Sequence, residues 1–317
     1  MVNQGKILRA YRYHMDDEYY TFYDDVESHF GRILAENPYI FEDKVIYFPC
    51  DDFEVSNFPK WFVSNQDSLR YKKLVCTSYH KSRDIGGGGL LSNSSIGKCT
   101  IVKSDKINSF NLQGYGDFRS VECQRYFDEA DIVVTNPPFS LSKDLYPKIL
   151  NKQFSIIGIN TDICQGNHIR YSILNGDVKV DALVSGKFIR PDNSIKHVSS
   201  GIVWYSNLIT RDYSKSCCWD TMKNNLYNND KLCKWLNRHK FNGYPITDDG
   251  YLYVPIVSAI PTDYDGYMLC SLAYLPYIDR NTFELISYER GDHHRLRGQN
   301  LSALLLIRRN RCFVSIQ

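Results

Sequence analysis

Short apolar runs alternate with longer amphipathic stretches over the first half of the chain. Four short runs are mainly apolar and rich in β-branched or aromatic residues, which predicts buried strands: 44–50, 73–77, 131–135 and 154–159. Between them, 55–69 and 141–150 carry apolar residues at helical spacing. This alternation predicts an α/β fold with a mostly parallel central sheet and helices on both faces. Ligands of such sheets bind at the carboxyl ends of the strands, where Asp51, Asp52 and Asn136 fall.

A glycine-rich stretch interrupts this alternation. Residues 79–104 have little apolar content and include four consecutive glycines at 86–89. Glycine has no side chain to pack and populates many backbone conformations, so the stretch is predicted to be a loop. A flap over a substrate and an inserted linker both fit this composition.

The second half has a different pattern, and the chain is expected to contain two domains. The stretch 180–209 is typical of hairpin strands, and strand-like runs recur at 251–257 and 301–307. A chain of 317 residues is long enough for two domains of ordinary size. We therefore place a boundary near residue 208, with one domain over 1–208 and a second region over 209–317.

Composition narrows the class of protein further. Aromatic residues make up 14% of the chain and its formal net charge is only +2, which excludes a disordered tail. The sequence has no long apolar run and residues 1–18 are polar, so neither a transmembrane helix nor a secretory signal is expected. The cysteines form no CxxC pair and no zinc-like spacing. We expect reduced thiols, no bound metal and a cytoplasmic protein.

Charge is uneven along the chain. Residues 1–60 are net acidic, whereas 290–317 is strongly basic. This last stretch contains a single acidic residue, Asp292, and six arginines: Arg290, Arg295, Arg297, Arg308, Arg309 and Arg311. It fits a surface that contacts phosphates, which makes Arg290, Arg295 and Arg297 candidate nucleic-acid contacts. A solvated face around one buried strand fits this composition as well.

The sequence that carries chemistry is Asn136-Pro137-Pro138-Phe139, directly after the predicted strand 131–135. The side-chain oxygen of Asn136 and the carbonyl oxygen of Pro137 can each accept one N–H of an exocyclic amine. Such contacts raise the electron density on an amine nitrogen whose lone pair is otherwise delocalised into an aromatic ring. Pro137 and Pro138 together fix a turn that exposes this carbonyl, since proline has no N–H to compete for it. Phe139 offers a flat face for stacking on the aromatic ring.

This tetrapeptide resembles motif IV of the amino-methyltransferases that use S-adenosylmethionine. Three further segments extend the likeness: 17–27 resembles motif X, 44–58 stands where motif I belongs, and 114–120 resembles the segment that packs on the cofactor adenine. With these spacings, the chain resembles the EcoRI-type adenine-specific DNA methyltransferase family over residues 16–210, and more loosely beyond them.

The resemblance implies roles for individual residues. The catalytic residues would be Asn136, Pro137, Pro138 and Phe139, with Phe139 stacked on the target base. The residues implied at the cofactor site are Tyr20, Thr21, Cys50, Asp51, Asp52, Asp117, Phe118 and Asn136. Among these, Asp117 would accept a hydrogen bond from the cofactor adenine, and Phe118 would stack on its ring. In this motif order the DNA contacts, including Arg290, Arg295 and Arg297, would lie in the C-terminal region.

The first two strands depart from the superfamily pattern. The glycine-rich loop that usually follows the first strand is absent, and Cys50-Asp51-Asp52-Phe53 stands in its place. The second strand ends at Ser78-Tyr79 rather than at the usual acid, which leaves the partner of the cofactor ribose open. No GxGxxG follows the first strand, so a dinucleotide-binding protein is not indicated.

The resemblance implies a Rossmann-like methyltransferase fold with a C-terminal target-recognition region. The implied activity is that of a sequence-specific DNA adenine N6-methyltransferase, which uses S-adenosylmethionine and flips its target base out of double-stranded DNA. A cognate restriction endonuclease is a candidate partner, and the protein is not expected to bind a membrane. It would be associated with the nucleoid, as a monomer or a weak dimer. There are two alternatives. The protein could methylate an RNA base or a protein glutamine, or it could be a non-catalytic DNA-binding protein of the same fold.

Overall fold

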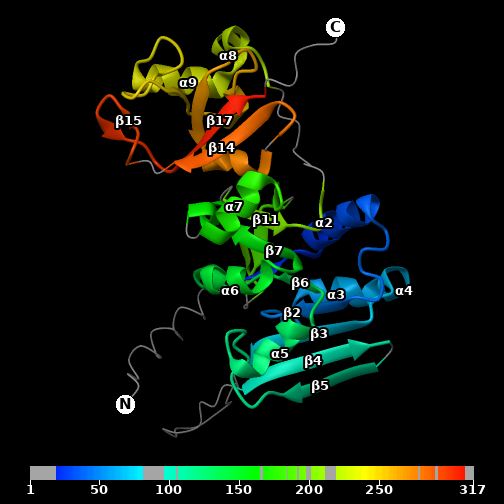
Figure 1. The fold of residues 1–317 in the computed structure, drawn as a ribbon. Helices are drawn as coiled ribbons and strands as arrows, with labels where there is room; N and C mark the ends of the chain where they lie inside the picture. The colour runs from blue at the N-terminus through cyan, green and yellow to red at the C-terminus, as the bar shows by residue number, and fades with distance from the viewer. Residues whose placement is uncertain are drawn as a thin grey trace, which may run out of the picture. The chain divides into compact units, whose positions relative to one another are not determined.

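The computed structural model shown in Figure 1 describes residues 19–80, 96–104, 106–164, 167–183, 185–190, 193–197, 201–210, 219–277, 279–289 and 292–310. The chain folds as two compact units. The first comprises residues 1–159 and 183–210, and the second comprises residues 160–182 and 211–317. Within the described ranges, every helix is too short or too polar to cross a membrane.

The first unit is built on a sheet whose strand order within this unit is β5-β4-β3-β2-β6-β7-β11. Its centre is parallel and confirms the four predicted strands, which are β2 (Val45–Phe48), β3 (Lys73–His80), β6 (Ile132–Thr135) and β7 (Gln153–Ile159). The outer strands pair antiparallel, and they are β4 (Ile96–Lys103), β5 (Lys106–Asn111) and β11 (Ile202–Ser206).

The sheet is therefore mixed, and the expectation of a mostly parallel sheet is wrong. The connection between β4 and β5 is so short that only antiparallel pairing is available to them. The loop predicted over 79–104 is also wrong in part, because β4 is a strand that buries Cys99 and Val102. The four glycines at 86–89 lie outside the described residues.

Helices cover both faces of this sheet, as predicted. Successive residues of a strand point to opposite faces, so neighbouring aromatic residues identify the helices on each side. Phe48 and Trp204 contact the helices of one face, α2 (Tyr23–Glu36) and α3 (Asn57–Ser64). Tyr47 and Tyr205 contact those of the other, α5 (Val121–Glu129) and α6 (Ser142–Ile149). α6 confirms the helix predicted over 141–150.

The helix predicted over 55–69 is divided in two. α3 ends at Ser64, and α4 (Gln66–Leu69) follows after a break at Asn65. The Asn65 side chain donates through Nδ2 to the carbonyl oxygen of Trp61, 2.8 Å away. Asparagine side chains that bond to the local backbone in this way compete with the helical pattern, which explains the break.

A smaller sheet of the first unit contains strands from distant parts of the chain. β1 (Tyr20–Thr21) pairs antiparallel with β9 (Lys187–Ile189), which pairs in turn with β10 (Ile195–His197). The hairpin strands predicted over 180–209 are thus confirmed. This pairing places residues near the N-terminus beside a hairpin that lies far away in sequence.

The second unit has its own sheet, with the order β12-β13-β17-β14. Its strands are β12 (Leu252–Val254), β13 (Tyr267–Ser271), β14 (Phe283–Glu289) and β17 (Leu304–Arg309). β12 and β17 confirm the strand-like runs predicted at 251–257 and 301–307.

Short helices, a hairpin and one further strand complete the elements of the described second unit. The helical elements are η2 (Asn160–Cys164), α7 (Asn167–Asn175), α8 (Met222–Asn228), α9 (Asp230–His239), η3 (Val257–Ala259) and η4 (Leu272–Tyr277). The remaining strands are β8 (Lys179–Ala182) and a two-stranded hairpin formed by β15 (Arg295–Leu296) and β16 (Gln299–Asn300).

Trp204 lies in the core of the first unit. Its side chain is 1% exposed and stacks on His29, with ring centroids 3.9 Å apart and 1° between the ring planes. His29 Nε2 lies 2.6 Å from Ser155 Oγ, within hydrogen-bond distance. Strands β11 and β7 and helix α2 are therefore joined by one buried aromatic and polar contact.

Replacing Trp204 with alanine is expected to lower the free energy of unfolding by about 3–5 kcal/mol, because it empties a packed core position. Chemical denaturation followed by circular dichroism measures this change. The control Tyr39→Ala removes a side chain that is 65% exposed. The control is expected to cost less than about 1 kcal/mol, and equal effects of the two substitutions would contradict the core assignment.

Candidate active site

The tetrapeptide 136–139 begins at the carboxyl end of β6, a strand that lies between β2 and β7. All four residues of β6 are buried, whereas Asn136 is only half-buried. Pro138 has an extended backbone with φ −54° and ψ 123°, and Leu141 N donates to its carbonyl oxygen over 2.8 Å. The two prolines thus turn the chain from a buried strand into a short helical turn, η1 (Phe139–Leu141), that leads to α6.

Asn136 is held in one orientation by the main chain of a distant segment. Its Nδ2 donates to the carbonyl oxygen of Tyr19, 2.5 Å away. Two positions further along, the carbonyl oxygen of Thr21 accepts from Asn57 Nδ2 over 2.8 Å. The segment 19–21 is therefore bound at both ends by asparagine side chains. Because the Asn136 amide donates toward Tyr19, its acceptor Oδ1 lies on the opposite side of the amide group.

The predicted cofactor residues Tyr20 and Thr21 lie in this segment. Tyr20 is half-buried and pairs with Ile189 in the small sheet. Thr21 is 2% exposed, and its Oγ1 is buried with no hydrogen-bond partner among the described residues. A buried hydroxyl without a partner is costly, and it marks a position where a ligand atom can complete the bonding.

Asp51 connects the ends of two central strands. It is 3% exposed, its Oδ2 accepts from Thr135 Oγ1 over 2.7 Å, and its Oδ1 accepts from Ser56 Oγ over 2.8 Å. Thr135 is the residue directly before Asn136. A buried carboxylate needs such donors, and here they connect the loop after β2 to the start of the tetrapeptide.

Asp52 and Cys50, the neighbours of Asp51 in sequence, lie at the same carboxyl end of the central strands. Asp52 Oδ2 accepts from Ser78 Oγ in the carboxyl-terminal half of β3, 3.1 Å away. Burial and the adjacent charge of Asp51 raise the pKa of the Cys50 thiol well above its ordinary value. The thiol of Cys50 therefore stays protonated at neutral pH.

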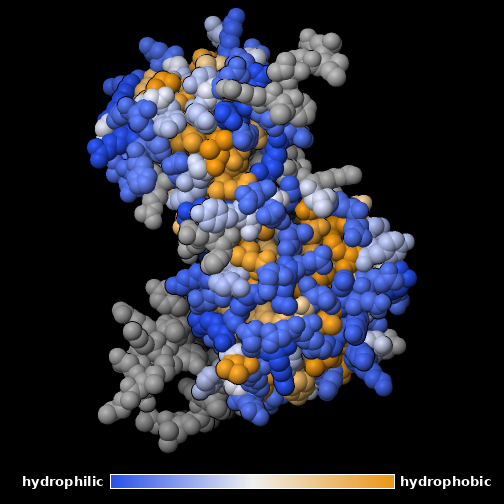
Figure 2. Space-filling model, in the orientation of Figure 1, coloured by the Kyte–Doolittle hydropathy of each residue, from blue (hydrophilic) through white to orange (hydrophobic). Residues whose placement is uncertain are grey.

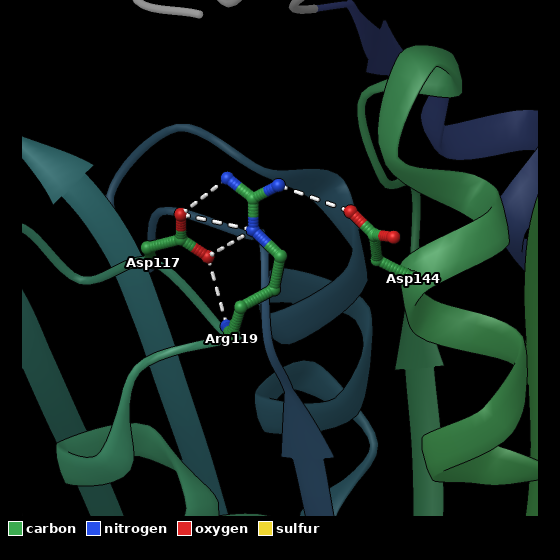
Figure 3. A network of polar contacts seen from close by, with 3 residues as sticks. All are labelled: Asp117, Arg119 and Asp144. Atoms are coloured by element: carbon green, nitrogen blue, oxygen red, sulfur yellow. Dashed lines mark hydrogen bonds and ion pairs between the residues drawn. The ribbon is translucent and has the colours of Figure 1, made fainter. Parts of the chain in front are cut away.

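Asp117 is held by an arginine that the sequence analysis did not single out. Figure 3 shows Arg119 between two carboxylates: its Nη2 donates to Asp117 over 2.7 Å and its Nη1 donates to Asp144 over 3.0 Å. The hydrogen bonds that the Arg119 guanidinium donates to Asp117 raise the pKa of that guanidinium. Since Asp144 lies in the first turn of α6, Arg119 joins the segment 114–118 to the helix that follows the tetrapeptide.

The segment that carries Asp117 packs closely on the sheet. Gly116 has φ +76°, and a Cβ built on it would lie 2.4 Å from the carbonyl oxygen of Ser78. Only glycine fits at this position. Phe118 is 2% exposed and packs edge-on against Phe127, so its ring lies in the core of the unit. Its predicted stacking on the cofactor adenine stays a prediction.

Lys196 is a second residue that sequence reasoning missed. Its Nζ lies 2.5 Å from the Tyr19 hydroxyl and 4.2 Å from the centroid of the Tyr19 ring. The lysine is on β10, so only the pairing of β1, β9 and β10 brings it here. It places a positive charge beside the segment that holds Asn136.

The predicted DNA contacts lie in the second unit, apart from Arg290, which falls outside the described residues. Arg297 donates to the carbonyl oxygens of His239 and Lys240 at the end of α9, over 3.1 and 3.0 Å. Arg295 is exposed, and its Nε donates to Asn300 Oδ1 over 3.0 Å.

These observations define a class of protein. An α/β fold with Asn-Pro-Pro-Phe at the carboxyl end of a central strand, and with carboxylates after the adjacent strand, is the arrangement expected of an amino-methyltransferase. The chain belongs to the adenine-specific methyltransferase EcoRI family, whose model matches residues 7–311. The resemblance drawn from the sequence motifs is therefore confirmed.

Three relatives are similar over most of their length. The type II methyltransferase M.EcoRI of Escherichia coli is 30% identical over 304 residues, which cover 90% of each chain. M.MgeORF184P of Mycoplasma genitalium is 27% identical over 293 residues, and M.MpnI of Mycoplasma pneumoniae is 28% identical over 290. Each of these two alignments covers 86% of this chain and 82% of the relative. No solved structure matches the chain.

Thr135→Val tests the connection between Asp51 and the tetrapeptide. Valine keeps the shape but leaves one oxygen of a buried carboxylate without its donor, which is expected to lower the free energy of unfolding by about 1–3 kcal/mol. Thr135→Ser keeps the hydroxyl and is expected to lose less, since it removes only a methyl group. Denaturation midpoints of both variants measure this difference, and a valine variant as stable as the parent would show that the bond is dispensable.

Proposed function

We propose that this protein is a sequence-specific DNA adenine N6-methyltransferase with a Rossmann-like catalytic domain. The observation that carries the proposal is the orientation of Asn136, whose Nδ2 donates to Tyr19 and whose Oδ1 lies on the opposite side. Membership of an adenine-specific methyltransferase family supports adenine as the substrate base. The relatives are named as type II methyltransferases, which supports double-stranded DNA as the substrate. The reaction would take place in the cytoplasm, and a cognate restriction endonuclease is the partner to be sought.

The chemistry requires an acceptor pair rather than a base. Asn136 Oδ1 and the Pro137 carbonyl oxygen accept the two N–H groups of the adenine amine, which localises the nitrogen lone pair. Phe139, half-buried at the start of η1, stacks on the flipped base. With the amine held in this way, its nitrogen would take up the methyl group in line while the methyl–sulfur bond of the sulfonium breaks. The leaving group would be the neutral thioether, and the proton would leave the nitrogen after the transfer. The rate then depends on positioning of the two reactants.

Residues at the carboxyl ends of the central strands, next to the tetrapeptide, fit S-adenosylmethionine. When bound, this cofactor supplies an electrophilic methyl group on a sulfonium. The unpartnered Thr21 hydroxyl is a buried polar atom that such a ligand would satisfy. Asp52 and Asp117 are partly exposed carboxylates that can accept from ribose hydroxyls and the adenine amine. Asp51 is tied to Thr135 and Ser56, so its role is to position the loop around the cofactor.

Asn136→Ala is expected to reduce methyl transfer by at least about 10²–10³-fold, the loss typical of removing one transition-state hydrogen-bonding group. The variants are expressed in a methylation-deficient host, and N6-methyladenine in the host DNA is mapped by sequencing. Asn37→Ala, which removes an exposed asparagine amide of the same unit, is the matched control. Unchanged methylation by Asn136→Ala would refute the mechanism. A wild-type protein that binds S-adenosylmethionine but leaves host adenine unmodified would refute the DNA substrate.

Arg119→Ala is expected to raise the KM for S-adenosylmethionine about tenfold, which corresponds to about 1.4 kcal/mol. The physical reason is that Asp117 loses the donors that hold it in place. Initial rates over a range of cofactor concentrations measure the change. Arg125→Ala, an exposed arginine on α5, is the control and should leave KM unaltered. A KM unchanged in both variants would remove Asp117 from the cofactor site.

A further inference from the structure

The β15–β16 hairpin projects from the second unit (Figure 1), and Figure 2 shows this end of the unit as hydrophilic. Arg295 pairs with Asn300, and Leu296 pairs with Gln299. Apart from the half-buried Leu296, every residue from Arg295 to Asn300 is exposed. A two-stranded ribbon of this kind is one of the two elements that fit the major groove of DNA.

The turn of this hairpin is held in a strained conformation. Arg297 and Gly298 have φ values of +51° and +78°, which is the geometry of a type I′ turn. Asp248 holds the turn, because its two carboxylate oxygens accept from Arg297 N and Gly298 N over 3.0 and 2.8 Å. The Arg297 guanidinium lies 3.8 Å from the centroid of the Phe241 ring and also binds the end of α9. The ribbon is therefore fixed relative to its unit before any ligand binds.

The base of the hairpin is fixed as well. His294 is 7% exposed and lies between two acids, with Nδ1 2.6 Å from Asp249 and Nε2 3.6 Å from Glu289. Leu301 N donates to the His294 carbonyl oxygen over 3.0 Å. Both ends of the ribbon are thus anchored, so the side chains that it displays have defined positions.

Arg295 and Asn300 lie on the same face of the ribbon, since directly paired residues of two antiparallel strands share a face. Asn300 Oδ1 accepts from Arg295 Nε over 3.0 Å, which sets the plane of the guanidinium. Among the described residues, no other group accepts from this guanidinium. Its two Nη groups then form a donor edge that matches O6 and N7 of guanine.

Other arginines of the basic stretch differ in this respect. Arg308 donates to Glu284 over 2.6 Å and Arg309 donates to Asp265 over 3.2 Å, so their charges are already paired. Arg297 is bound to backbone carbonyls. Among the described arginines of 290–317, Arg295 is the one that is exposed and bonds through Nε to a neighbouring side chain, with no acid or backbone carbonyl of the described residues bound to its Nη groups.

We propose that the β15–β16 hairpin enters the major groove of the substrate and that Arg295, oriented by Asn300, binds a guanine of the methylation site. This inference rests on the proposed function and adds the base that the second unit recognises. Arg295 is the specificity-determining residue, and Asn300 is a positioning residue that acts through it.

The test measures the affinity of the full-length protein for a set of duplexes. One duplex carries the methylation site found by sequencing the host DNA, and in the others each base pair of that site is replaced in turn. Wild-type protein is expected to discriminate against replacement of one G·C pair by about 5- to 150-fold, and Arg295→Ala is expected to lose this discrimination. Arg309→Ala, which removes a paired arginine of the same unit, is expected to keep it.

Asn300 is tested by two substitutions. Asn300→Ala is expected to reduce discrimination at the same base pair, while Asn300→Asp keeps the acceptor for Arg295 Nε and should retain the discrimination at a lower overall affinity. A general loss of stability would lower the affinity for all duplexes and would not spare the aspartate variant.

Several results would overturn the proposal. Equal weakening of all duplexes by Arg295→Ala would assign the arginine to a phosphate instead of a base. Undiminished discrimination in that variant, or a methylation site without a G·C pair, would exclude guanine recognition by the hairpin. Failure of the proposed function is seen separately, because the wild-type protein would then leave no methylated adenine in the host DNA.

Discussion

The hydrogen bond from Asn136 Nδ2 to the Tyr19 carbonyl oxygen is the contact on which the candidate site depends. A primary amide donates from one side and accepts from the other, so binding its donor side to the main chain determines where its acceptor points. The segment that supplies this carbonyl is itself held at Thr21 by Asn57. Orientation of the acceptor therefore requires no titrating group, which suits a reaction whose nucleophile loses its proton only after transfer.

Further hydrogen bonds at the carboxyl ends of the central strands connect Asn136 to the loop after β2. Asp51 is bound to Thr135, the residue before Asn136, and Asp52 is bound to Ser78 in the neighbouring strand β3. Carboxylates buried in this way are stable only when their donors are in place. The loop after β2 has no glycine-rich turn, and its position is fixed by the hydrogen bonds of Asp51 and Asp52. A site assembled before its ligands arrive avoids reorganisation during the reaction.

Local patterns predicted β6 and its tetrapeptide, because both can be read within a short stretch of sequence. Arg119 and Lys196 could not be found in that way, because their partners Asp144 and Tyr19 lie 25 and 177 positions away. β4 was missed for a related reason: its burial depends on pairing with β3, and its lysines and threonine masked the strand pattern. The parallel centre of the sheet was therefore predictable, whereas its antiparallel edge at β4 and β5 was not.

The basic C-terminal stretch shows what composition alone cannot separate. Arg295 and Arg297 are two positions apart and equally charged, yet one displays its donors and the other uses them on the end of α9. A non-glycine residue in the left-handed region costs about 1–2 kcal/mol, and Arg297 adopts it because Asp248 and Phe241 compensate. Strain that the surroundings maintain in this way is found where the position of a segment matters. Because the turn is held in this way, the neighbouring Arg295 is fixed in one position on the hairpin.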